Sequence, residues 1–413
     1  MKVWVSLGNC KSLKGTPVTI ETMYFLPFFL VIAIVLLIIS PASAEPGRLH
    51  GIIIGHGSGM LNNPFRILSL DDPLLLLDTY PLPADLIPQE KRKLDRVYYP
   101  RTRGELLEYD LMVFHGPRIQ HFTPGQVHDL DFAFREGGMA AFCGLTGLGL
   151  GWEGPVLLGV IPIIERSVSP YERSYRPHFR ENRDPVFTPL LQYGIDRVYG
   201  NVYTEMYPKP GATVWADIVP YGLPWLVSWR PAGSGPGMLW NVAHIFDIWW
   251  DENNNPYALD VATNMLFYSL EMDLVIDIPA RRRARNMFRN VRVQMSLIVS
   301  MMNWAESFGA NTAELSDILV DLEEEAERAA NDYINQEYEP AISFLESLFE
   351  EVKLTTTKAV SLKNQALLWV YAIEWLTVSG TGAVCGFVLW TIMVRRSSYK
   401  GVETTRLKSI DEC

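Results

Sequence analysis

The segment from Tyr109 to Gly151 constrains the fold more than any other stretch of this sequence. It contains an apolar run at 111–114, a Thr-Pro pair at 123–124 that is typical of a helix start, and a second apolar run at 139–143 that follows a Gly-Gly pair. The order strand, helix, strand, Gly-rich loop is the repeating unit of a doubly wound, mostly parallel α/β sheet. In such a domain, ligand-binding loops follow the carboxyl ends of the strands.

Further elements are predicted before and after this unit. Leu49–Ile54 reads as the first strand and 96–99 as the second, so that with the two apolar runs above they form a parallel set. A short helix is predicted at 102–108. The proline-rich segment 64–93 is predicted to be mostly irregular, and 165–185, rich in Arg, Tyr and Pro, to be a surface excursion.

The second half of the domain is predicted to be β-rich and to close with a helix. Three β-type runs occur at 211–218, 224–229 and 238–243, and a Gly-rich, hairpin-like turn joins the last two. Apolar residues at helical spacing over 256–270 predict the closing helix. The α/β domain is therefore assigned to residues 45–275.

The order of these features resembles class I glutamine amidotransferase-like domains over residues 48–272. The resemblance rests on the GG-initiated strand with its Gly loop (137–151), Pro-Lys-Pro-Gly-Ala-Thr-Val (208–214), Pro-x-Leu-Val-x-Trp (224–229), the Gly-rich hairpin, and Asn-x-Leu-x-Tyr (264–268) in the closing helix. The chain is most similar to the non-glutaminase relatives in that group. The resemblance implies a flavodoxin-like α/β fold.

The resemblance also implies where catalysis would occur. Family members carry Gly-x-Cys-x-Gly at a sharp turn and a downstream His-x-Glu. Here the best register, 143–147, places Leu145 at the nucleophile position, and His244-Ile-Phe-Asp247 stands where His-Pro-Glu is expected. Cys143 and His244 are therefore the candidate catalytic pair. The alternative is that Cys143 is a buried, inert thiol, which is the commoner fate of a cysteine with apolar neighbours.

Candidate ligand-binding residues lie in loops that follow predicted strands, where backbone N–H groups can approach an anion. They are Gly55, His56, Gly57, His115, Gly144 and Thr146. His115, His121 and His128 lack the spacing of a metal site, so neither a metal nor another cofactor is predicted.

Charge and cysteine usage exclude other classes of protein. The formal net charge of -11 argues against a nucleic-acid partner, whose binding surfaces are basic. Of the 4 cysteines, Cys10 precedes the apolar leader, Cys385 lies in a second apolar segment and Cys413 is terminal. Only Cys143 remains in the α/β domain, which excludes a disulfide framework there.

The N-terminal residues predict a secretory signal peptide over 1–44. Lysines precede an apolar run at 24–39, and the small residues Ala42-Ser43-Ala44 follow it, as at a cleavage site. Met23 is a possible alternative start, and an uncleaved signal anchor is the alternative interpretation of the run.

The C-terminal third predicts a helical stalk and one membrane span. Amphipathic helices over 276–365 form the stalk, 366–394 is a low-charge segment long enough to cross a bilayer, and 395–413 is a cytoplasmic tail that begins with Arg395-Arg396. Basic residues after a span favour a cytoplasmic C-terminus. The chain is therefore predicted to be a single-pass type I protein of the cell membrane, with its bulk extracytoplasmic.

Two functions from different classes are compatible with this organisation. The first is a non-catalytic amidotransferase-like module that acts in binding or assembly at the cell surface. The second is a membrane-tethered Cys/His hydrolase of amide or glycan-linked substrates. The predicted partners are membrane lipid and a protein, or a second copy associating through the stalk and the transmembrane helix, where Gly380, Gly382 and Gly386 leave room for close helix contact.

Overall fold

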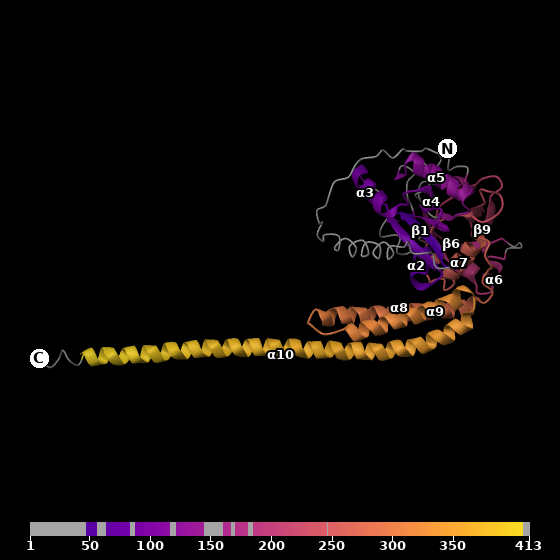
Figure 1. Ribbon diagram of the computed structural model, residues 1–413. Helices are drawn as coiled ribbons and strands as arrows, with labels where there is room; N and C mark the ends of the chain where they lie inside the picture. The colour runs from indigo at the N-terminus through magenta and orange to yellow at the C-terminus, as the bar shows by residue number, and fades with distance from the viewer. Residues whose placement is uncertain are drawn as a thin grey trace, which may run out of the picture. The chain divides into compact units, whose positions relative to one another are not determined.

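The computed structural model describes residues 47–55, 63–82, 87–115, 121–143, 160–166, 170–180, 185–245 and 247–407 (Figure 1). The predicted signal peptide (1–44) and the end of the predicted cytoplasmic tail (408–413) lie outside these ranges. So do the strand-end loops that hold His56, Gly57, Gly144 and Thr146.

A mixed sheet forms the centre of the α/β part. Nine strands in the described residues are ordered β2-β1-β3-β4-β11-β10-β9-β6-β7. The first five are parallel: β2 (Leu75–Pro81), β1 (Leu49–Gly55), β3 (Leu111–His115), β4 (Ala140–Cys143) and β11 (Leu239–Val242). The antiparallel remainder is β10 (Leu223–Trp229), β9 (Thr213–Val219), β6 (Tyr171–Phe179) and β7 (Gly200–Tyr203). A small antiparallel pair joins β5 (Ile163–Arg166) to β8 (Met206–Pro208).

Helices cover both faces of the parallel half of this sheet. Phe142 contacts Phe65 of α2 (Pro64–Asp71), whereas Phe114 contacts Phe134 of α5 (Pro124–Arg135). Because Phe142 is paired in register with Val113, Phe142 and Phe114 point to opposite faces. The remaining short helices of the domain are α3 (Pro88–Tyr98), α4 (Arg103–Leu106) and α6 (Thr188–Leu191), with 3-10 turns η4 (Ile195–Arg197) and η5 (Ile248–Trp250). The α/β class is confirmed.

Local helix signals in the sequence are confirmed where they are strongest. The Thr123 hydroxyl accepts a hydrogen bond from the backbone N–H of Gln126, and the Gln126 side chain accepts one from the backbone N–H of Thr123. This reciprocal cap fixes the start of α5, with Pro124 at the first helical position. The closing helix is α7 (Ala258–Ser269), within the predicted 256–270.

The predicted second strand at 96–99 is wrong. These residues end helix α3, where the Val97 side chain is 70% exposed, and the second parallel strand is β2 at the sheet edge. Leu75 and Leu77 are buried while Leu76 is exposed, so β2 follows the period of two expected of a strand. The proline at 81 lies at the end of this edge strand, where a missing N–H is tolerated. The prediction that 64–93 is mostly irregular is also wrong, because this segment contains α2, β2 and the first part of α3.

The predicted surface excursion at 165–185 is also wrong for its central part. Residues Tyr171–Phe179 form β6, which pairs with β9 and β7. Tyr175 and Phe179 are buried, whereas Arg176 and His178 are exposed, so the basic residues line the outer face of this part of the strand. The three β-type runs predicted after residue 210 correspond to β9, β10 and β11.

Three long helices follow the sheet domain: α8 (Ile278–Glu306), α9 (Ala313–Ile334) and α10 (Tyr338–Leu407). Asp277 caps α8 by accepting a hydrogen bond from the N–H of Ala280. The third stalk helix and the apolar segment at 366–394 were predicted separately, and they form one continuous helix. Among the described residues α10 is the helix long and apolar enough to cross a membrane, and its most apolar window is unburied.

Two buried ion pairs join α8 to the sheet domain. Arg281 donates to Asp72 with 2.6 Å between Nη2 and Oδ2, and Arg285 forms a two-pronged contact with Asp260 at 2.7 and 3.1 Å. Tyr333 of α9 also donates to Asp72, at 2.6 Å. All of these side chains are nearly inaccessible to solvent. The predicted boundary at residue 275 is therefore crossed by paired buried charges, and the helices and the sheet share one compact unit.

Candidate functional site

The carboxyl ends of the parallel strands lie along one edge of the sheet, as the sequence predicted for a ligand-binding region. Gly55 ends β1 beside His115, which ends β3. A Cβ on Gly55 would lie 2.0 Å from the carbonyl oxygen of His115, and its φ of 156° falls outside the usual range for other residues. Glycine at 55 is thus required by the close approach of the two strand ends.

His115 belongs to the cap of the first helix. Its Nδ1 lies 3.4 Å from Nδ2 of Asn63, and the Asn63 Oδ1 accepts a hydrogen bond from the N–H of Phe65 at 3.0 Å. Both side chains are buried. Asn63 is the N-cap of α2, and an Asn followed by Pro64 is the sequence signal of a helix start. The contact assigns His115 a position in the packed interior at the end of β3.

Cys143 is the last residue of β4 and lies inside the sheet. It is paired in register with Phe114 of β3 and Asn241 of β11, and it is 2% exposed. Burial raises the pKa of its thiol well above the usual value. The cavity that Cys143 helps to line has a volume of about 10 Å³ and otherwise apolar walls, too small for a substrate.

His244 lies beyond the end of β11 and is largely buried. Asn241 is the register partner of Cys143, so His244 lies three residues beyond the position level with Cys143, after β11 has ended at Val242. The two candidate catalytic residues therefore lie near the carboxyl ends of the neighbouring strands β4 and β11.

Asp247, which stands where the resemblance predicted a glutamate, joins two segments of backbone through hydrogen bonds. Its carboxylate accepts hydrogen bonds from the N–H groups of Asn201, Val202 and Trp249, at 3.0, 2.7 and 2.7 Å. Burial raises the pKa of Asp247, and these hydrogen bonds partly oppose the shift. The carboxylate thus anchors β7 to η5.

Two polar groups near β11 were not identified from the sequence, because no motif marks them. The Oδ1 atom of Asn241 and the Oγ1 atom of Thr204 are buried without a hydrogen-bond partner in the structure. The Asn241 Nδ2 group lies 3.0 Å from the Met206 sulfur, and the Thr204 N–H donates to the Ala243 carbonyl. The β7–β8 segment, with Thr204 and Met206, therefore contacts β11 and the residue after it.

The histidines of the first half do not gather into a metal site within the described ranges. His121 is buried at the start of the α5 region and His128 is exposed on α5. No group of three or more potential metal-binding side chains occurs in the part of the chain that the structure describes. Of the six candidate ligand-binding residues, Gly55 and His115 are described.

Neither comparison with known proteins supplies a relative. No protein-family model matches the chain, and no curated protein is significantly similar to it in sequence. Function is therefore argued from the residues and their geometry.

Proposed function

We propose that this chain is a membrane-anchored, extracytoplasmic module with an amidotransferase-like fold, and that it acts in binding or assembly at the cell surface without catalysing a reaction. The observation that carries the non-catalytic assignment is the position of Cys143. A nucleophilic cysteine needs a thiolate, which a nearby cation or a helix N-terminus provides. Among the residues that the structure describes, neither acts on the pKa of Cys143, and burial favours its neutral form.

The contacts of Asp247 support the same proposal. Its carboxylate accepts hydrogen bonds from three backbone N–H groups and holds β7 and η5 together. In the family that the sequence resembles, an acid orients the catalytic histidine. The rival function, a membrane-tethered Cys/His hydrolase, would require the Cys143 thiol to contact His244 and an acid to contact His244.

We predict that Cys143 of the native protein reacts with iodoacetamide at pH 6.5 more slowly than Cys143 of the same protein unfolded in urea. A free thiol has a pKa of about 8.5, and the fold raises it further, so the reactive thiolate is scarcer in the native state. Mass spectrometry of the Cys143 peptide measures both rates.

Faster labelling of native Cys143 than of the unfolded control, abolished by His244→Ala, would establish the hydrolase. A His244→Ala variant that labels as slowly as the wild type supports the binding module. Asn241→Ala is a matched control, because Asn241 is the register partner of Cys143 and carries no titratable group.

The membrane anchorage in this proposal rests on α10. Large apolar side chains are exposed along its second half, among them Trp375 at 75% and Leu376 at 73%. Such a surface is unfavourable in water and favourable in hydrocarbon, with aromatic residues near the interface. Arg395 and Arg396 follow the apolar stretch and favour a cytoplasmic end.

For this topology we predict that protease added to intact cells removes the sheet domain and the stalk helices, and leaves a fragment that contains 366–413. Antibodies against tags at each end of the mature chain follow the two parts on a gel. Detergent-permeabilised cells are the control, since the C-terminal tag should then be lost as well. Protection of the sheet domain in intact cells, with loss of the C-terminal tag, would reverse the orientation.

A further inference from the structure

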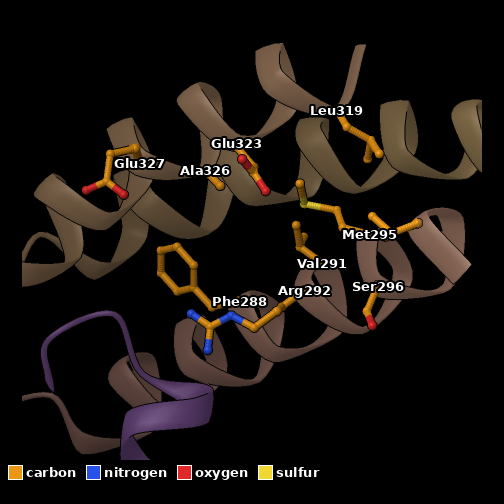
Figure 2. Close-up of a pocket in the computed structure, with 10 residues that line it drawn as sticks. Phe288, Val291, Arg292, Met295, Ser296, Leu319, Glu323, Ala326 and Glu327 are labelled. Carbon is orange, nitrogen blue, oxygen red and sulfur yellow. The ribbon is translucent and has the colours of Figure 1, made fainter. Parts of the chain in front are cut away.

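The helices α8 and α9 leave a groove between them. α10 packs closely on both, and α8 packs far more extensively on α10 than on α9. The groove has a volume of about 490 Å³ and is lined entirely by side chains of α8 and α9 (Figure 2). Its apolar lining consists of Phe288, Val291, Met295, Val299, Leu319 and Ala326. A groove of this kind, between neighbouring antiparallel helices, fits the side chains of another helix.

The two sides of the groove carry opposite charges. Arg292 lies on the α8 side, and Glu323 and Glu327 lie on the α9 side (Figure 2). Glu327 pairs with Arg48, near the start of the described chain. Arg292 and Glu323 form no ion pair with any residue that the structure describes. Both are exposed, so each is available to a partner of opposite charge.

Exposed apolar side chains also occur on α8 beside the groove. Val293, Leu297 and Val299 are 60%, 48% and 43% exposed. Exposed apolar side chains with a charged border are typical of a protein interface.

We propose that a second copy of this chain occupies the groove. Two copies anchored by α10 share one orientation relative to the membrane, so a two-fold axis that relates them runs along the helices. Rotation about this axis places α8 of one copy opposite α9 of the other and leaves every residue at the same height. Because Arg292 and Glu323 line the same groove, Arg292 then faces the partner subunit's Glu323, and the reverse pair forms equally.

This arrangement explains both features of the surface. The apolar linings of the two grooves meet at the centre, where α8 and α9 of each copy form a four-helix core, and the charges pair at its edges. The inference depends on the proposed membrane anchorage only for the shared orientation of the two copies. Its test therefore includes a separate reading of membrane insertion.

The experiment uses charge reversal in the full chain, with two differently tagged copies co-expressed in one membrane. Arg292→Glu alone and Glu323→Arg alone are each expected to reduce self-association about tenfold, because like charges then face each other at both pairs. A mixture of one Arg292→Glu copy with one Glu323→Arg copy is expected to restore association, since both facing pairs are again opposite in charge. Co-purification of the two tags in mild detergent measures the association.

Glu324→Arg is the matched control, because Glu324 neighbours Glu323 but does not line the groove. Mixed with the Arg292→Glu copy, it should not restore association. A wild-type chain that is membrane-inserted but monomeric would overturn the inference. Single variants that associate as strongly as the wild type would overturn it too, as would a mixture of Arg292→Glu and Glu323→Arg copies that associates no better than either variant alone. Monomers that become dimers only after removal of residues 1–44 would assign the groove to that segment instead. A chain absent from the membrane fraction would refute the anchorage, which is a separate result.

Discussion

Replacing Arg285 with methionine is expected to lower the free energy of unfolding by about 3–5 kcal/mol, because the Asp260 carboxylate then remains buried without its partner. The two side chains are 1% and 3% exposed and form two parallel hydrogen bonds. Burial acts to lower the pKa of the Arg285 guanidinium, but Asp260 outweighs it and the pKa is raised. Urea unfolding of the detergent-solubilised protein, followed by tryptophan fluorescence, measures the change.

Two further variants separate the charge effect from the loss of packing. Arg289→Met, one turn further along α8, removes an arginine that is 46% exposed and pairs with Glu252 and Asp71. Its expected cost is at most about 1 kcal/mol, as for other exposed pairs. The double variant Asp260→Leu/Arg285→Met should recover most of the lost stability, because removing both members leaves no uncompensated charge. An Arg285→Met variant as stable as Arg289→Met would contradict the importance assigned to the buried pair.

A chain that ends at residue 275 is expected not to fold, whereas one that ends at residue 365 folds and stays soluble. The shorter chain lacks α8, α9 and α10, so it loses the partners of Asp72 and Asp260 together with the apolar cover that α8 gives to α2. Exposed apolar surface costs about 25 cal/mol per Å², and the total stability of a domain is only about 5–15 kcal/mol. Thermal unfolding of both purified chains, each beginning at residue 45, tests this expectation.

A third chain identifies the cause of the failure. It ends at residue 275 and carries Asp72→Asn and Asp260→Asn, which remove the two negative charges and preserve the size of the side chains. We expect it to fail to fold as well, because it still lacks the apolar cover of Ile278 and Ala284. Recovery of a folded state by these two substitutions would instead make the unpaired charges the cause. A cooperative unfolding transition of the unmodified short chain, at the temperature of the longer one, would restore the domain boundary predicted from the sequence.

The sequence determined those parts of the fold whose signals are local. The buried strands at 111–114 and 139–143 are continuous apolar runs, and the α5 start is encoded by Thr123, Pro124 and Gln126 within four residues. The long apolar stretch of α10 is recognisable from composition alone. Each of these signals arises from backbone geometry or from solvent transfer of neighbouring residues, so no knowledge of distant contacts is needed.

Edge strands were harder to predict because their signals depend on what covers them. The β2 strand alternates buried and exposed residues only because one side of the edge faces the domain, and its flanking prolines looked like loop signals. The charged residues of β6 likewise suggested a surface loop, and only the sheet shows that they lie on the exposed face of a strand. In both segments tertiary position overrode the local composition.

The chemistry of the candidate site depended on tertiary structure still more. Cys143, His244 and Asp247 have the chain order of a catalytic set, but the register of β4 against β11 places the thiol within the sheet, and the N–H groups of Asn201 and Val202 engage the acid. The arginines at the start of α8 carry no local signal of burial, since an amphipathic helix usually exposes its charged residues. Only the fold brings Arg281 to Asp72, 209 residues away, because burial is a property of the assembled layers and not of the local sequence.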